Sequence, residues 1–123
     1  MRKLLVSVSA TGALIVGAGA AYAQDCSEGP KCASVSARAQ DYLSTLSSTS
    51  GINDSATQAY CMNMVAAEVA SFCASELRQM GNADCANLAE QQAEENKRVA
   101  GEALGTAAAT ASSSSWHAKC GWN

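Results

Sequence analysis

The stretch SATQAYCMNMVAAEVASFCASELRQM, residues 55–80, predicts the central helix of the fold. Its apolar side chains recur every three or four residues and form one broad helical face: Cys61, Val65, Val69, Phe72, Cys73 and Met80. Ser55 followed by Gln58 has the spacing of a capping box, so we expect Ser55 to cap this helix. Beyond the end of the stretch, Gly81 and Asn82 are residues that tolerate a left-handed helix end.

Helices are also predicted on both sides of this stretch. The earlier one covers roughly residues 33–46 and is followed by a Ser/Thr/Gly loop at residues 47–51. Its apolar face consists of Val35, Ala39, Tyr42, Leu43 and Leu46. The later one begins near Cys85, with Asp84 as its expected cap. Because no stretch shows the apolar and polar alternation of a half-buried strand, we predict an all-α fold, a small three-helix up-down-up bundle.

The helix that starts near Cys85 is poor in large apolar residues. Its stripe contains Leu88, Val99 and Leu104, diluted by alanines and by Gln92 and Asn96. Glu94 and Arg98 have the spacing of an i,i+4 ion pair, which contributes about 0.2–0.5 kcal/mol. Gly101 and Gly105 weaken the helix further on.

The N-terminus predicts export. A charged start, MRK at residues 1–3, precedes an apolar run over residues 4–21 that ends in the small-residue pattern AYA. This is the composition of a cleavable signal peptide, so residues 1–23 are expected to be removed after Ala23. A retained membrane anchor is the alternative, but serine, threonine and glycine make the run weakly hydrophobic for a span. We therefore expect no stable membrane insertion after cleavage.

The cysteines predict a disulfide framework. All six lie beyond the cleavage site: Cys26, Cys32, Cys61, Cys73, Cys85 and Cys120. An even number of cysteines in an exported chain is typical of paired bonds. Leu, Ile, Val and Phe account for only 11 of the 100 mature residues, too few for an ordinary core. Three disulfides, each contributing about 2–4 kcal/mol, would match the stability of a whole small domain.

Helix geometry restricts which cysteines meet. Cys61 and Cys73 lie twelve residues apart on one helix, about 18 Å along its axis, too far for a disulfide. In an up-down-up bundle, the start of the first helix, the end of the second and the start of the third share one end of the molecule. Four cysteines lie at that end: Cys26, Cys32, Cys73 and Cys85. Cys61 lies at the opposite end, where a returning tail would bring Cys120. We predict the bond Cys61–Cys120 and leave the pairing of the other four open.

No metal or cofactor is predicted. Zinc is the competing use of six cysteines, but the chain has no C-x2-C pair and a single histidine, His117. A thiol oxidoreductase would need C-x-x-C, and covalent haem attachment C-x-x-C-H. His117 has no sequence partner for acid–base chemistry, so we assign no catalytic residues.

The C-terminal part carries the candidate binding residues. Residues 106–115 contain only Thr, Ala and Ser, which indicates a tether or a frayed helix end. We therefore divide the mature chain into a helical domain, 24–110, and a Ser-rich linker with a tail, 111–123. The candidate binding residues in this tail are Trp116, His117, Lys119 and Trp122. Tryptophan dominates interface hot spots, but the competing interpretation, which we favour, is that both rings cover a core poor in aromatics.

These observations favour a non-enzymatic exported protein, periplasmic or extracellular. Loss of residues 1–23 leaves six basic against eleven acidic residues, a net charge of −5, which argues against nucleic acid as a partner. We expect an envelope or extracellular interaction module with an unknown protein partner. The alternatives are a secreted inhibitor or toxin-like effector, and a periplasmic carrier of a small apolar ligand held near methionines. The methionines considered are Met62, Met64 and Met80.

Overall fold

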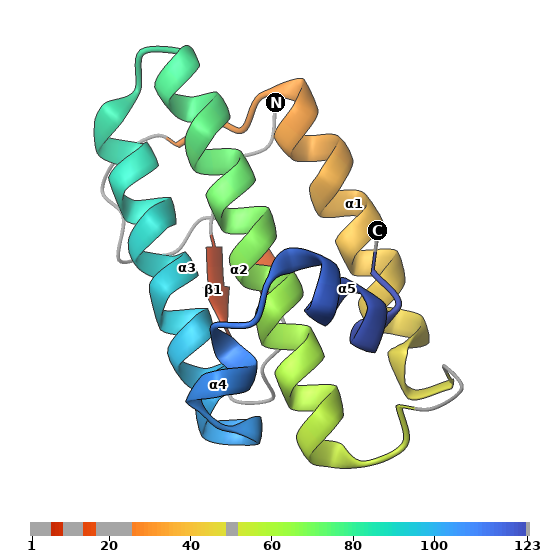
Figure 1. Ribbon diagram of the computed structural model, residues 1–123. Helices are drawn as coiled ribbons and strands as arrows, with labels where there is room; N and C mark the ends of the chain where they lie inside the picture. The colour runs from red at the N-terminus through yellow and green to blue at the C-terminus, as the bar shows by residue number, and fades with distance from the viewer. Residues whose placement is uncertain (1–5, 9–13, 17–25, 49–51, 123) are drawn as a thin grey trace.

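The computed structural model describes residues 6–8, 14–16, 26–48 and 52–122, and residues 26–48 and 52–122 form an all-α bundle (Figure 1). The helices are α1 (Pro30–Thr45), a 3-10 turn (Leu46–Ser48), α2 (Ser55–Gln79), α3 (Ala83–Leu104), α4 (Thr106–Ala109) and α5 (Ser113–Cys120). Figure 1 shows α1, α2 and α3 running in alternating directions with α2 in the middle. The predicted up-down-up bundle is confirmed, and two short helices are added to it.

Two three-residue strands precede the bundle. β1 (Val6–Val8) pairs antiparallel with β2 (Leu14–Val16), and Val6 lies opposite Val16. Sequence periodicity did not predict them, but Val and Ile are frequent in strands. Both strands fall within the predicted signal peptide. The predicted cleavage point after Ala23 lies outside the described residues.

The N-terminal cap of α2 differs from the prediction. Asp54, not Ser55, is the N-cap: its Oδ2 accepts a hydrogen bond from the Thr57 backbone N–H at 2.8 Å. The predicted capping box is wrong because Ser55 is already the first residue of the helix. Asp54, one position earlier, has the extended backbone of a cap residue, from which its side chain reaches the first turn. Gln58 instead donates from Nε2 to the carbonyl oxygen of Ile52. At the other end, Gly81 adopts the left-handed backbone that was expected, with φ of 83°.

The details of α3 also differ. Asn82 is its cap, accepting from the Cys85 N–H at 3.2 Å, and Asp84 lies in the first turn instead. The predicted pairing of Arg98 with Glu94 is wrong: Arg98 binds Glu95 and Glu102, because its planar guanidinium reaches carboxylates one turn away on both sides.

The serine-rich segment is helical and not a tether. α4 occupies Thr106–Ala109, and Ser112 caps α5 by accepting from the Ser115 N–H at 3.4 Å. Alanine has the highest helix propensity, and serine is a preferred cap, so this composition suits two short helices once tertiary contacts hold them in place.

Small side chains bring α2 and α3 together. These two helices share the most extensive packing in the described part of the chain. Eight of their buried residues are alanines: Ala66, Ala67, Ala70, Ala74, Ala86, Ala89, Ala93 and Ala100. Alanine lets two helix backbones approach closely, and dispersion contacts between close-packed atoms then compensate for the scarcity of large apolar groups.

The α2 face is narrower than its sequence indicated. Cys61, Val65, Val69 and Cys73 are buried as predicted. Phe72 and Met80 are instead 43% and 49% exposed, because α1 and α3 cover only part of the broad apolar stripe.

All six cysteines are paired. The predicted bond Cys61–Cys120 is confirmed and joins α5 to α2. At the opposite end the bonds are Cys32–Cys73, from α1 to α2, and Cys26–Cys85, from the segment before α1 to α3. The loops that they close span 59, 41 and 59 residues, for which chain entropy predicts about 4 kcal/mol of stabilisation per bond. Three such bonds fit an exported protein.

The alanine contact predicts a low tolerance for larger side chains. Ala89 is 3% exposed, so Ala89→Leu forces apart two close-packed helices and should lower the free energy of unfolding by about 1–3 kcal/mol in urea titrations. The control Ala56→Leu, on the exposed first turn of α2, should stay within about 0.5 kcal/mol of wild type. Equal stability of the two variants would mean that α2 and α3 are not tightly packed.

Candidate functional site

A groove of about 840 Å³ lies between α1 and α2. Its walls are Pro30, Lys31, Ser34, Val35 and Arg38 from α1 and Glu68, Ser71 and Phe72 from α2. The α1 residues recur with helical spacing, so roughly two turns of that helix face the groove. Phe72 supplies its largest apolar side chain. Two smaller depressions, about 390 and 460 Å³, are lined mainly by polar and charged residues.

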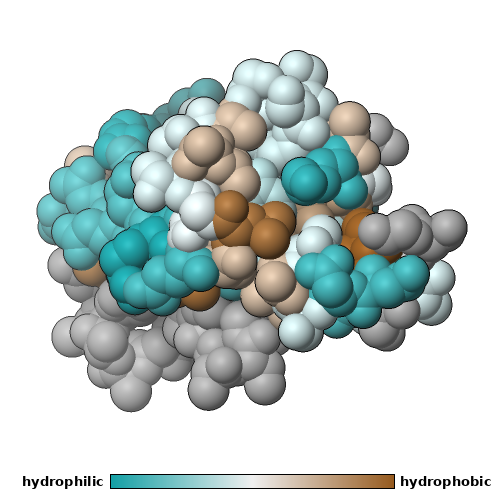
Figure 2. Space-filling view, turned by 60° about the horizontal axis from the view of Figure 1, so that its bottom comes forward, coloured by the Kyte–Doolittle hydropathy of each residue, from teal (hydrophilic) through white to brown (hydrophobic). Residues whose placement is uncertain are grey.

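The groove between α1 and α2 is a better candidate for recognition than the two smaller, polar depressions. Figure 2 shows the end of the bundle at which α2 begins, and in its coloured part hydrophobic side chains form small areas between hydrophilic ones. Phe72 and Met80 are the exposed large hydrophobic residues of the described chain, and of these Phe72 lies in the groove. An exposed aromatic ring in a concave site is a frequent anchor for a partner.

A buried carboxylate, Glu76, lies at the end of the groove where α1 begins. Glu76 of α2 is 8% exposed and accepts hydrogen bonds from the backbone N–H groups of Lys31 and Cys32, at 3.1 and 2.8 Å. These N–H groups belong to the first turn of α1, where no backbone carbonyl of the helix is placed to accept from them. A Cβ on Gly29 would lie 2.5 Å from the Glu76 carboxylate, so this close approach needs glycine.

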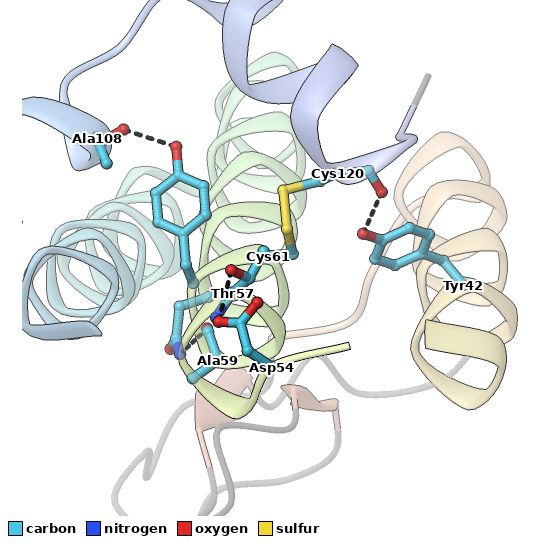
Figure 3. The surroundings of a disulfide bond; sticks show 9 residues. Tyr42, Asp54, Thr57, Ala59, Cys61, Ala108 and Cys120 are labelled. Atoms are coloured by element: carbon cyan, nitrogen blue, oxygen red, sulfur yellow. Dashed lines mark hydrogen bonds between the residues drawn. A yellow bond between two sulfur atoms is a disulfide. The ribbon is translucent and has the colours of Figure 1, made fainter. Parts of the chain in front are cut away.

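α5 lies across α1 and α2 (Figure 1). Near it, Arg38 and Glu68 of the groove contact Trp122. Its last residues pack on α1: the Tyr42 hydroxyl donates to the Cys120 carbonyl oxygen at 2.6 Å, beside the Cys61–Cys120 bond (Figure 3). The Trp122 ring meets Tyr42 edge to face at 5.4 Å, and the Arg38 guanidinium lies 4.7 Å from the Trp122 ring centre.

One carboxylate of α2 holds two groups of the tail. Glu68 Oε1 lies 2.6 Å from His117 Nε2, and Glu68 Oε2 accepts from the indole N–H of Trp122 at 2.6 Å. Both oxygens are therefore engaged in attaching α5 and Trp122, two residues beyond it, to α2. Glu68 also lines the groove, so the carboxylate that positions the tail forms part of the groove wall.

The structure separates the four predicted binding residues. Trp116 and Trp122 are 5% and 3% exposed, so the interpretation of both rings as part of the core is confirmed and the ring surfaces are not available to a partner. His117 is bound to Glu68, and Lys119 is exposed on α5. The physical reason is the Cys61–Cys120 bond, which draws the tail onto the bundle.

The groove residues were missed from the sequence. The sequence pattern places Phe72 on the core stripe of α2. It gives no signal for Glu68, because it predicts a linker and tail where α5 forms. Lys31 and Arg38 lie seven residues apart, about two helical turns, but the helix predicted from the sequence begins near residue 33, so a shared face for the two cations follows only from the observed start of α1 at Pro30. None of the methionines proposed for ligand binding lines the groove; Met64 is buried and Met80 lies at the end of α2.

The arginine of the groove differs from the two arginines elsewhere in the described chain. Arg78 pairs with Glu90, and Arg98 pairs with two glutamates. Within the described residues, Lys31 and Arg38 form no ion pair with a carboxylate. An acidic chain therefore presents, in this partly apolar groove, two cations that form no ion pair with a carboxylate.

In the described ranges no cluster of three or more His, Cys, Asp or Glu side chains has the arrangement of a metal site. No helix there combines the length and the apolar character that crossing a membrane requires. Comparisons with protein-family models, with characterised proteins and with solved structures found no significant match. The function is therefore argued from the residues themselves.

The tail should depend on its disulfide. In the double variant Cys61→Ala with Cys120→Ala, α5 loses its covalent attachment, so tryptophan emission should shift to longer wavelength and stability should fall by about 2–4 kcal/mol. Both tryptophans of the chain lie in the tail, which makes emission a specific readout.

The matched control is the double variant Cys26→Ala with Cys85→Ala. It opens a loop of the same 59-residue span at the other end of the bundle, so stability should fall comparably while native emission stays unchanged. Unshifted emission in the Cys61 and Cys120 variant would show that non-covalent contacts alone seat the tail.

Alkaline pH should weaken the contact between α1 and the tail. Burial raises the pKa of Tyr42 to about 12, whereas an unfolded tyrosine ionises near pH 10. The stability that this shift contributes is complete below pH 10 and is lost as the pH rises through 12, because the unfolded chain releases its proton first. Urea titrations between pH 8 and 11.5 should show this decline.

In Tyr42→Phe the decline should be shallower, and stability at neutral pH should be lower by about 1 kcal/mol because the bond to Cys120 is lost. The remaining slope would come from Tyr60, whose pKa is also raised by burial. A Tyr42→Phe variant with an unchanged slope would contradict this assignment.

Proposed function

We propose that this chain is an exported, non-catalytic interaction module that binds a protein partner in the groove between α1 and α2. The observation that carries the proposal is Phe72, 43% exposed in a groove of about 840 Å³. Fully burying such a side chain contributes about 1.5–3 kcal/mol, and a partner that covers the exposed part of the Phe72 ring would recover a share of it.

The walls of the groove are held in place before any partner arrives. Cys32–Cys73 joins α1 to α2, Glu76 binds the first turn of α1, and Cys61–Cys120 fixes α5 at the far end. A rigid site loses little conformational entropy on binding, so more of the contact energy is available as affinity. This rigidity supports a binding role.

The open form of the groove favours a protein partner over a small ligand. Pro30, Ser34, Arg38 and Phe72 are all exposed along its walls. Carriers of small molecules bury most of the ligand surface in an enclosed site, whereas helices and peptides of partners lie in open grooves.

Export is the second part of the proposal. The charged start and apolar run of residues 1–23 support a signal peptide, and three disulfides support folding in an oxidising compartment. The periplasm or the extracellular space is the proposed location.

Phe72→Ser tests the proposal. The oxidised mature protein, residues 24–123, is immobilised and exposed to the exported fraction of its host, and bound proteins are quantified by mass spectrometry. A specific partner should be captured by wild type and lost, at least tenfold, with Phe72→Ser. Because the ring is exposed, the melting temperature should change little.

Met80→Ser is the matched control, since Met80 is equally exposed but lies outside the groove. It should capture the partner as wild type does. If Phe72→Ser captures the partner as wild type does, the interaction lies elsewhere on the protein. If both variants lose the partner, capture depends on exposed apolar surface in general and not on the groove.

A further inference from the structure

The cations of the groove are spaced along one helix face. Lys31 and Arg38 are seven residues apart on α1, which places their Cα atoms about 10 Å apart along the axis. A partner with two carboxylates two helical turns apart matches this spacing.

The same α1–α2 surface already accepts a helix. α5 lies on it next to the groove. Arg38 and Glu68 line the groove, and both contact Trp122, the second residue after α5. The groove is therefore the continuation of an existing helix-binding surface. A second helix placed there would pack on α1 and α2 as neighbouring helices of a bundle do.

Arg38 keeps its donors available. The ring of Trp122 lies at its guanidinium with 4.7 Å to the ring centre, a cation–π contact that orients the group. A guanidinium carries five N–H donors in its plane, so a carboxylate can bind along an edge while this contact persists. Glu68, the acidic residue of the groove, has both oxygens engaged by His117 and Trp122.

We propose that the partner inserts an acidic amphipathic helix into this groove, with an apolar side chain against Phe72 and Val35 and carboxylates at positions i and i+7 that bind Lys31 and Arg38. This inference rests on the proposed function and specifies the chemistry of the partner. Burial of the apolar side chain supplies most of the affinity, because exposed ion pairs contribute about 0–1 kcal/mol each. The charges set the orientation of the helix and the rate of association.

The test uses a library of helical peptides of one length, each with leucines at i+3 and i+4, and with glutamate, glutamine or lysine at i and i+7. Binding to the oxidised mature protein is measured by fluorescence anisotropy at low and high salt. We expect the glutamate peptides to bind at least tenfold more tightly than the lysine peptides, with a preference that shrinks as salt is added.

Charge reversal provides the specific readout. Lys31→Glu with Arg38→Glu should reverse the preference, so that lysine peptides bind more tightly than glutamate peptides. Lys97→Glu with Lys119→Glu changes the net charge equally outside the groove and should leave the preference as in wild type. Phe72→Ser should weaken every peptide.

Several outcomes would overturn the acidic-helix proposal: no binding by any glutamate peptide, equal binding of the three peptide sets, or equal effects of the two charge-reversal variants. Binding of anionic phospholipid vesicles that requires Lys31 and Arg38 would replace the helix by a lipid surface, and a Phe72-dependent dimer in sedimentation would replace it by a second copy. If the captured partner needs Phe72 but is indifferent to charge reversal at Lys31 and Arg38, the proposed function stands and this inference fails.

Discussion

Covalent attachment to α2 is the constraint on which the rest of this bundle depends. Cys32–Cys73 holds α1 and Cys61–Cys120 holds α5 to this one helix, at its two ends, while Cys26–Cys85 ties the segment before α1 to the start of α3. With few large apolar side chains, packing alone supplies little of the free energy that orders so short a chain. The bridges act by limiting the unfolded ensemble, which leaves the interior free to be built from alanine.

The tail connects this framework to the candidate site. Because Cys120 is bonded to α2, Trp122 reaches Tyr42, Arg38 and Glu68, and these contacts close one end of the groove. At the other end Glu76 satisfies the first turn of α1. The groove is therefore bounded by two carboxylates of α2, each of which performs a structural task. The consequence is a concave surface whose shape is set before binding.

The groove brings the exposed Phe72 together with two cations that form no ion pair with a carboxylate in the described chain. Outside the groove Arg78 and Arg98 are paired with glutamates, and Met80 is the other large apolar side chain that stays exposed in the described residues. In the isolated protein the exposed aromatic ring costs free energy because water solvates it poorly. Such a surface is consistent with recognition, and the walls that frame it are rigid enough to be selective.

Sequence alone determined the helical class, the three long helices, the need for disulfides and the pairing of Cys61 with Cys120, because helical periodicity and the reach of a disulfide are local or geometric rules. It also favoured burial of Trp116 and Trp122. Only the tertiary structure decided which residues cap α2 and α3, that the serine-rich segment folds into helices, and that Phe72 remains exposed while Glu68 binds the tail. These outcomes depend on which helices become neighbours, and a helical pattern specifies a face of one helix without specifying what covers it.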